Sequence, residues 1–319
     1  MVRLILTRIP QMIIVVLGVS FLAYTIMFLL PGDIVHSILG ENYTEEAGAQ
    51  LSAQLHLDQP FLVRYFTWLG DLFTGHIGDS LFPPRQDVWT IVGRSLLPTT
   101  EMLIIGEITA LVLGILFAVV SVASRSRIVD RIVQAVALAC SSIPGFVLAL
   151  LLLTLFAVRF QLVSPRGWVD PANGGWGENL AHIAFPSIIL GIFTFPAIMR
   201  VFRAELVDQL DNEDYVTLGR LKGISAPRVI FGHVLRNSSF GLLTVVGINV
   251  ARLIAGVIVI ESVFAIPGMG SLIRSSVVQH DTPTALVAVT IVATFVVVVN
   301  LFVDILYAIL DPRVRSGSA

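Results

Sequence analysis

Five ionisable side chains lie within or beside long apolar stretches, and these are the residues best placed to do chemistry. They are Glu101, Glu107, Arg252, Glu261 and Asp304. A charge in hydrocarbon costs at least ~2.5–3.5 kcal/mol on membrane-insertion scales, so such side chains usually face a protein interior or a water-filled cavity. In that setting they can bind a charged solute, pass protons along or pair with one another.

Arg252 is the most informative of these residues because it falls near the middle of its apolar stretch. Helical spacing puts Asn249 on the same face about one turn back, so we expect both to face a solute pathway or a protein interface. An ion pair of Arg252 with Glu107 or Asp304 fits the sequence equally well. The carboxylates nearest the ends of the stretches can instead be interfacial: Glu101, Glu261 and Asp304.

Motifs of common catalytic and metal sites are missing from the sequence. There is no H-E-x-x-H, no G-x-S-x-G, no C-x-x-C and no G-x-x-x-x-G-K-[ST] phosphate loop. The histidines are scattered without metal-ligand spacing, and the single cysteine, Cys140, excludes an internal disulfide. We therefore predict neither a catalytic nor a metal site. Any uphill transport must draw its energy from another chain or from an ion gradient.

The charges are sparse because the chain as a whole is apolar. Mean hydropathy is +0.87, hydrophobic residues make up 55% and charged residues 13%, against roughly 25% charged residues in a soluble domain. Apolar runs extend over the whole length of 319 residues. This pattern predicts one multi-pass membrane domain rather than two soluble domains.

Hydropathy predicts an all-α polytopic protein with six transmembrane helices. The spans are expected at about 9–30, 99–123, 132–160, 182–199, 240–265 and 283–310. The first run ends in Pro-Gly without a small-residue cleavage site, which favours a retained anchor over a signal peptide. Ser142-Ile-Pro-Gly145 predicts a kink within the third span.

Between the first two spans the chain turns polar. Residues 31–97 are too many for a plain linker and are expected to form a small extracytoplasmic cap. Residues 1–30 then form the N-terminus and first span, and residues 98–319 form the core. Most arginines fall on the face that holds both termini and the region after the fourth span. Because positive charge gathers on the cytoplasmic side, that face is predicted to be cytoplasmic.

The stretch from Asn212 to Asn237 is charged and interrupted, unlike its apolar surroundings. Glu213 and Asp214 suit the positive end of a helix dipole. Gly223 can take the left-handed conformation that closes a helix, and Ser225 can cap the next one. We predict two short helices joined by a sharp elbow at Gly223.

Short motifs follow one another along the chain. In the elbow they are Asp214-Tyr215, Arg220-x-Lys222-Gly223, Arg228-Val229 and His233-Val-Leu-Arg-Asn237. Elsewhere they are Pro31-Gly32-Asp33, Leu57-Asp58-Gln59-Pro60, Gly75-x-x-Gly78-x-Ser80, Pro98-Thr99-x-Glu101, Ser142-x-Pro144-x-Phe146, Glu261-x-Val-Phe264-x-x-Pro267-Gly268-x-Gly270 and Asn300-x-x-x-Asp304. Together they resemble the inner-membrane permeases of ATP-binding-cassette (ABC) importers, in particular the dipeptide and oligopeptide branch.

The resemblance implies a type I ABC importer permease fold in a bacterial cytoplasmic membrane. It implies a complex with a second, similar permease, two cytoplasmic ATPases and an external solute-binding protein that delivers peptides. ATP and magnesium would be bound by the ATPases, so no cofactor and no nucleic acid is expected for this chain. The cap is then the expected docking surface for the binding protein.

The resemblance also makes the elbow, within a loop at 203–238, the coupling helix that sits in a groove of the ATPase. The residues implied are Glu213, Asp214, Tyr215, Thr217, Leu218, Gly219, Arg220, Lys222 and Gly223. Thr217, Leu218 and Gly219 stand where the family has Glu-Ala-Ala. Glycine inside a helix lowers helix stability by roughly 1 kcal/mol relative to alanine, so Gly219 makes this helix less rigid. An apolar face of Tyr215, Leu218 and Leu221 suits a partner's groove.

Candidates for the translocation pathway are Asn249, Arg252, Glu107 and Asp304. Two alternatives stay open at this point. An ion-driven secondary transporter would use Glu107, Arg252 and Asp304 as a proton relay, although it leaves the elbow unexplained. Related ABC permeases also carry nickel chelates, glutathione or other small solutes in place of peptides.

Overall fold

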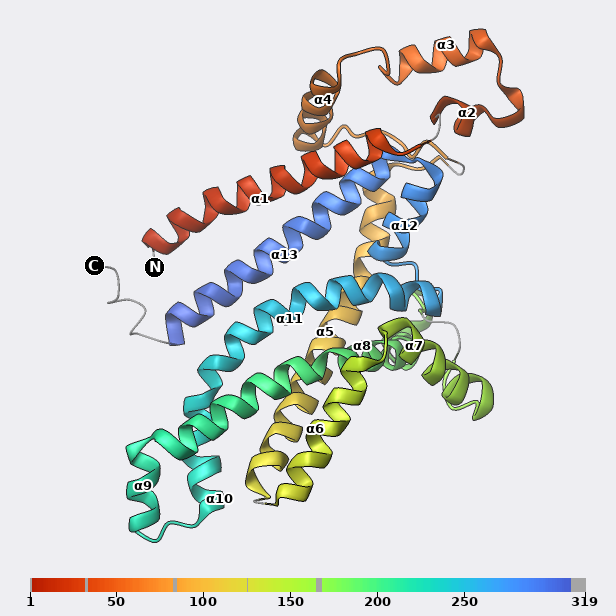
Figure 1. Cartoon of the computed structure of the whole chain (residues 1–319). Coiled ribbons are helices and arrows are strands. Elements are labelled where there is room, and N and C mark those ends of the chain that lie inside the picture. The colour runs from red at the N-terminus through yellow and green to blue at the C-terminus, as the bar shows by residue number, and fades with distance from the viewer. Residues whose placement is uncertain (1, 32–33, 83–84, 125, 165–167, 311–319) are drawn as a thin grey trace. The chain divides into compact units, whose positions relative to one another are not determined.

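The computed structural model describes residues 2–31, 34–82, 85–124, 126–164 and 168–310 (Figure 1). These residues are helical or lie in connecting loops, and none of the described residues belongs to a β-strand. The nearest approach to a sheet is one isolated bridge between Asp79 and Asp87. The predicted all-α polytopic fold is confirmed.

Within the described ranges, five helices are long and apolar enough to cross a membrane. They are α1 (Val2–Leu29), α5 (Val88–Ala123), α8 (Pro171–Asn212), α11 (Leu235–Phe264) and α13 (Thr282–Leu310). A bent pair, α6 (Arg127–Ser142) with α7 (Gly145–Leu153) and the π-helical turn η2 (Thr154–Arg159), makes a sixth if counted as one span. Each predicted span overlaps one of these elements.

The interruption in the third predicted span is larger than the kink that was expected. The axis turns by 98° between α6 and α7. Pro144 precludes the αR conformation for the residue before it, and Ile143 is extended, with φ −85° and ψ 126°. Pro144 also has no N–H to donate into α6, so the first helix ends at Ser142 and a new one begins at Gly145.

Helix α8 continues well beyond the predicted span at 182–199. Gly175 has non-helical angles, φ 75° and ψ 164°, so the regular helix starts after it and runs to Asn212. At 1.5 Å per residue, 176–212 is about 55 Å long, more than the roughly 30 Å of a bilayer's hydrocarbon core. Helix α8 therefore extends beyond the apolar span, and its last turns form a helical stalk that leads to the elbow.

The chain divides into two compact units. The first unit comprises Pro98–Ile266 with the start of α1 and the end of α13. Its core lies where α8 packs along α11, α6 and α5, around Phe195, Met199 and Phe202. Gly191 of α8 has no room for a side chain, because a Cβ there would lie 2.7 Å from the Gly106 carbonyl oxygen of α5. Small residues allow this close helix contact.

The second unit comprises Leu6–Leu97 and Pro267–Val297. It contains the short elements α2 (Ile34–Leu39), η1 (Gly40–Asn42), α3 (Glu45–Gln54), α4 (Phe61–Thr74) and α12 (Met269–Gln279). Tyr65 of α4 packs its ring on Tyr24 of α1 and hydrogen-bonds Ser20 at 2.9 Å. The Asp281 carboxylate accepts from Ser80 Oγ at 2.5 Å. Helix α12 was not predicted, and the predicted domain limits stay a prediction.

Candidate coupling and translocation sites

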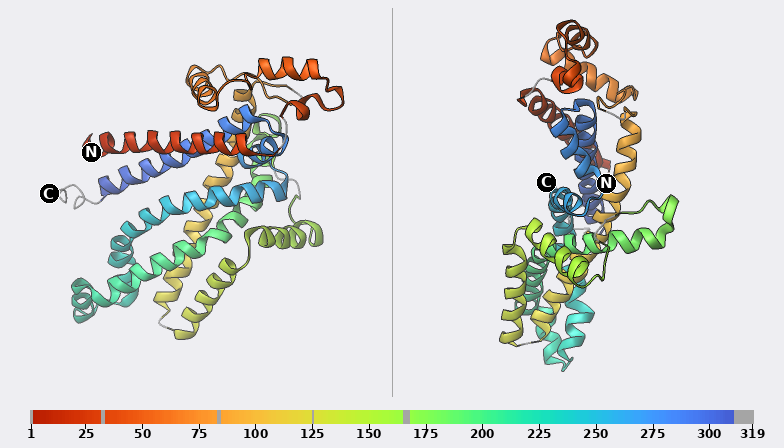
Figure 2. Two further views of the ribbon diagram at one scale, coloured as in Figure 1. Left: turned by 45° about the horizontal axis from the view of Figure 1, so that its top comes forward. Right: turned by 90° about the vertical axis from the view of Figure 1, so that its right-hand side faces the viewer.

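The elbow begins where α8 ends. Helix α9 (Asp214–Leu221) follows at once, Gly223 turns the chain with φ +73°, and α10 (Ala226–Val229) leads through the π-helical turn η3 (Ile230–Val234) into α11. Figures 1 and 2 show α9 and α10 together at the end of α8 where α11 begins. The Ile224 N–H closes the turn by donating to the Gly219 carbonyl at 3.0 Å. The predicted pair of helices and the glycine turn between them are confirmed.

One face of α9 is fixed to the first unit. Val216 is fully buried, and Tyr215 packs against the same core while its hydroxyl donates to Gln209 Oε1 at 2.7 Å. Gly219 is also buried, and a Cβ there would meet Val229 at 3.4 Å, an ordinary contact. The packing therefore has room for a small side chain at Gly219, whereas Gly223 is needed for its backbone conformation. Tyr215 points inward rather than joining Leu218 and Leu221.

The other face of α9 is uncovered and apolar at two positions. Leu218 is 54% exposed and Leu221 is 79% exposed, and residues three apart on a helix are neighbours. The polar residues of the predicted coupling set that are exposed beside them are Glu213, Asp214, Thr217 and Lys222. The side chain of Arg220 lies outside the described residues. Adjacent exposed leucines at the tip of a stalk are typical of a protein contact surface.

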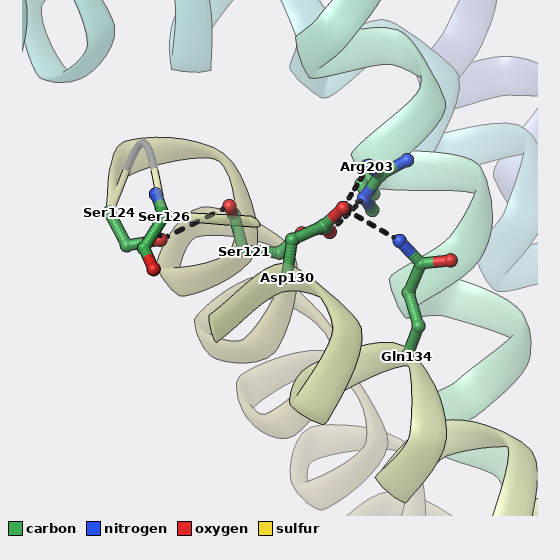
Figure 3. A network of polar contacts seen from close by, with 6 residues as sticks. All are labelled: Ser121, Ser124, Ser126, Asp130, Gln134 and Arg203. Atoms are coloured by element: carbon green, nitrogen blue, oxygen red, sulfur yellow. Dashed lines mark hydrogen bonds and ion pairs between the residues drawn. The ribbon is translucent and has the colours of Figure 1, made fainter. Parts of the chain in front are cut away.

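A network of polar contacts joins α5, α6 and α8 in the first unit (Figure 3). Asp130 of α6 receives two hydrogen bonds from Arg203 of α8, from Nε at 2.9 Å and from Nη2 at 3.0 Å. It also accepts from the hydroxyl of Ser121 in α5 and from Gln134 at 2.9 Å. Two parallel bonds between a guanidinium and a carboxylate are stronger than a single one. The network fixes three helices to one another beside the core that holds α9.

The structure brings two predicted pathway residues together. Asn249 Nδ2 donates to Glu107 Oε2 at 2.7 Å, between α11 and α5. Glu107 Oε1 and Asn249 Oδ1 are also buried, and neither has a hydrogen-bond partner among the described residues. Both are acceptors in the ionised form of the site, so this pair has a surplus of acceptors over donors.

Arg252 is separated from that pair. Asn249 is 1% exposed, whereas Arg252 is on the exposed side of α11, so the two side chains do not share a surface. Within the part of the chain that the structure describes, no ion pair joins Arg252 to Glu107 or to Asp304. Asp304 is half-buried on α13. The predicted set thus falls into one buried pair and two residues elsewhere.

Two further carboxylates, Glu261 and Glu101, accept hydrogen bonds from neutral donors. Glu261 is fully buried and accepts from Thr99 Oγ1 at 2.6 Å, so it is not interfacial. Glu101 accepts from Trp168 Nε1 at 2.8 Å and from Asn179 Nδ2 at 3.2 Å. These contacts link α5 to α8 and α11 and give both carboxylates a packing role. No cluster of three or more metal-ligating side chains occurs among the described residues.

A cavity of 440 Å³ in the first unit contains Arg252, together with Arg200, which the sequence had not singled out. Arg200 lies at the end of an apolar run, where it looked like one more cytoplasmic charge. Its Nη1 is 3.5 Å from Ser141 Oγ at the end of α6. Ser141 lies next to the bend between α6 and α7, and no sequence signal fixes the direction of that bend.

Comparison with known proteins gives the class and then the family. The described residues form an all-helical array with five or six apolar spans, which is the architecture of a multi-pass membrane protein. The family described as binding-protein-dependent transport system inner membrane component matches residues 110–316, and its N-terminal counterpart matches residues 1–105. The chain belongs to this family.

Two characterised relatives match over nearly the full length. The dipeptide transport system permease protein of Escherichia coli K12 is 32% identical over 338 aligned positions, covering 99% of each chain. The di/tripeptide transport system permease protein of Pseudomonas aeruginosa is 31% identical over 335 positions, again covering 99% of each.

Proposed function

We propose that this chain is a permease subunit of a peptide ABC importer, forming half of the pathway for di- or oligopeptides. Full-length similarity to dipeptide and di/tripeptide permeases supports the cargo. The uncovered Leu218 and Leu221 on α9 carry the mechanism, because they supply an apolar surface for a partner chain. The chain itself performs no catalysis and binds no cofactor.

The proposed complex contains a second, similar permease, two ABC ATPases and an external binding protein. The ATPases bind ATP and magnesium, and membrane lipid surrounds the spans. Both termini and the elbow are cytoplasmic in this proposal, which the distribution of arginines supports. The protein then resides in a bacterial inner membrane, with the region 31–97 on the outer side.

In this mechanism α9 is the coupling helix. Its leucines enter a groove on the ATPase, while the exposed Glu213, Asp214, Thr217 and Lys222 lie around them at the rim. Val216 and Tyr215 fasten α9 to the core of the first unit, so a movement of the ATPase surface displaces α8 and α11 as well. Gly223 sets the return angle of the chain into α10.

The test places a charge on the uncovered face. Leu221→Asp adds a carboxylate to a surface that must lose water on docking, and we expect the ATPases to be lost from the purified complex. Uptake of a radiolabelled dipeptide should fall by roughly 30-fold or more, as for loss of about 2 kcal/mol at an interface anchor. Copurification and uptake into proteoliposomes are the two measurements.

Ser225→Asp is the matched control. It adds the same charge four residues further along the chain, beyond the Gly223 turn, at the exposed position just before α10, where aspartate is as favourable as serine. This variant should retain its ATPases and its uptake. Normal assembly and uptake in Leu221→Asp would show that α9 does not contact the ATPase. Uptake that follows a proton gradient and ignores ATP would overturn the importer itself.

A further inference from the structure

The cavity that holds Arg200 and Arg252 is lined mainly by apolar residues, and its other polar side chains are the hydroxyls of Ser141 and Thr194. Its walls come from α6 and α7 at their bend, from α8 and from α11. Phe146, Phe193 and Val259 are among the apolar residues that line it. Among the described residues that line it, none is acidic. The cavity therefore combines two positive charges with a mainly apolar lining.

Neither arginine has a neutralising partner among the described residues of the first unit. Arg200 makes one long hydrogen bond, to the Ser141 hydroxyl at 3.5 Å. No carboxylate in the described ranges lies within ion-pair distance of either guanidinium. This differs from Arg203, one turn further along α8, whose charge is met by Asp130. Two guanidinium groups in one cavity without a carboxylate attract an anion.

The position of Arg252 indicates whether the cavity faces lipid or faces water and protein. Arg252 lies near the middle of Val245–Phe264, the most apolar part of α11, yet its side chain is exposed. An exposed, unpaired arginine at that depth is costly against lipid and is normally turned towards water or protein. The face of α8 and α11 around the cavity is thus an inner face, where a solute can reach it.

We propose that this cavity binds the terminal carboxylate of the peptide cargo during translocation. The inference rests on the proposed function for the identity of the cargo. Planar guanidinium groups bind carboxylates through paired N–H donors, and together the two arginines offer more donors than one carboxylate can use. The apolar wall takes the side chain of the peptide's last residue. The opposite charge and a 440 Å³ volume fit the end of a peptide and not a whole oligopeptide.

The first experiment measures binding in the assembled importer in nanodiscs, with no added binding protein. Val259→Cys in a Cys140→Ser background gives one thiol in the cavity wall for maleimide labelling. The probes are the dipeptide Ala-Phe and its C-terminal amide. Ala-Phe should slow labelling, and its amide should need a roughly tenfold higher concentration, as for loss of a charge-assisted hydrogen bond.

Arginine variants then assign the effect to the cavity. Arg252→Ala and Arg200→Ala should each weaken protection by Ala-Phe about tenfold and leave the weak protection by the amide unchanged. Arg252→Lys should retain part of the protection by Ala-Phe that Arg252→Ala loses. The control is Arg131→Ala, an exposed arginine of α6 that does not line the cavity. It should behave as the parent chain does.

Several results would overturn the inference. Equal protection by the acid and the amide would exclude a carboxylate site, and so would no protection by either. Labelling that depends on phosphatidylglycerol in the nanodisc and not on peptide would identify a lipid site. Loss of the second permease from Arg200→Ala or Arg252→Ala would identify a subunit interface. ATP-driven uptake of Ala-Phe by the unmodified importer tests the proposed function separately.

Discussion

Arg200 and Arg203 lie one helical turn apart on α8, yet their surroundings differ. Arg203 binds Asp130 through two nitrogen atoms, and Ser121 and Gln134 complete the shell of that carboxylate. Arg200 and Arg252 lie on the wall of a cavity whose described lining residues include no acid. A charge that is neutralised by its own chain holds helices together, whereas a charge left without a counterion is available to a ligand.

The two regions also differ in what surrounds them. The cavity beside the Arg203–Asp130 pair holds 320 Å³ and is lined by further charged residues, Arg127 and Asp211, as well as by Ile224 and Val229 of the elbow. A mixture of both signs next to α10 suits a structural joint between the elbow and the spans. The cavity of Arg200 and Arg252 carries one sign only.

The largest expected effect comes from breaking the neutralised pair. Arg203→Ala leaves the Asp130 carboxylate without its guanidinium, and the side chains are only 26% and 29% exposed, so we expect a loss of about 1.5–3 kcal/mol and little assembled protein. Thermal unfolding followed by size-exclusion chromatography measures this. Adding Asp130→Ala to Arg203→Ala should cost little more, because the partners act as one unit.

Arg200→Ala is the matched control for this experiment, since it removes the same side chain from the same helix. Its unfolding temperature should stay close to that of the parent chain. If Arg200→Ala destabilises as strongly as Arg203→Ala, the distinction between the two arginines is wrong.

A smaller effect is expected when the free arginine is given a partner. Ala255 lines the cavity one turn from Arg252, so Ala255→Asp places a carboxylate within reach of the guanidinium. The complex should assemble normally, but uptake of dipeptides with a free carboxylate should fall roughly tenfold, because the new ion pair competes for the charge. Ala255→Asn has nearly the same volume without the charge and should fall much less. Equal loss in both variants would point to steric blockage instead.

The comparison also separates what the sequence could predict from what it could not. Hydropathy located the spans, and Gly223 located the elbow, because these signals are local. Pro144 marked the break in the third span. A local pattern gives no angle, however, so only a kink was predicted where the helix axis turns by 98°. The length of α8 was underestimated because its last turns are polar and carry no hydropathy signal.

Contacts between distant residues were beyond the sequence. Asp130 and Arg203 are 73 positions apart, and Glu107 and Asn249 are 142 apart. An arginine near a span end looks the same whether its partner is an acid on another helix or a cargo. Arg203 and Arg200 were therefore both interpreted as cytoplasmic charges, and Tyr215 was placed on the wrong face of α9, because the packing of α9 on Val229 cannot be read from periodicity alone.

Glu107 and Asn249 form a third case, a buried carboxyl group with a neutral partner, and here we expect the smallest effect. In Glu107→Gln the new amide can accept from Asn249 Nδ2 and donate to Asn249 Oδ1, which has no partner among the described residues of the parent chain. Stability should change by less than about 1 kcal/mol, and uptake by less than twofold, because one unmet acceptor is satisfied and no bond is lost. Asn249→Leu, by contrast, removes the one hydrogen-bond donor to this carboxylate among the described residues, so it should cost about 1–3 kcal/mol. Abolished uptake in a stable, fully assembled Glu107→Gln complex would mean that the proton of this carboxyl group takes part in transport, which a structural pair does not require.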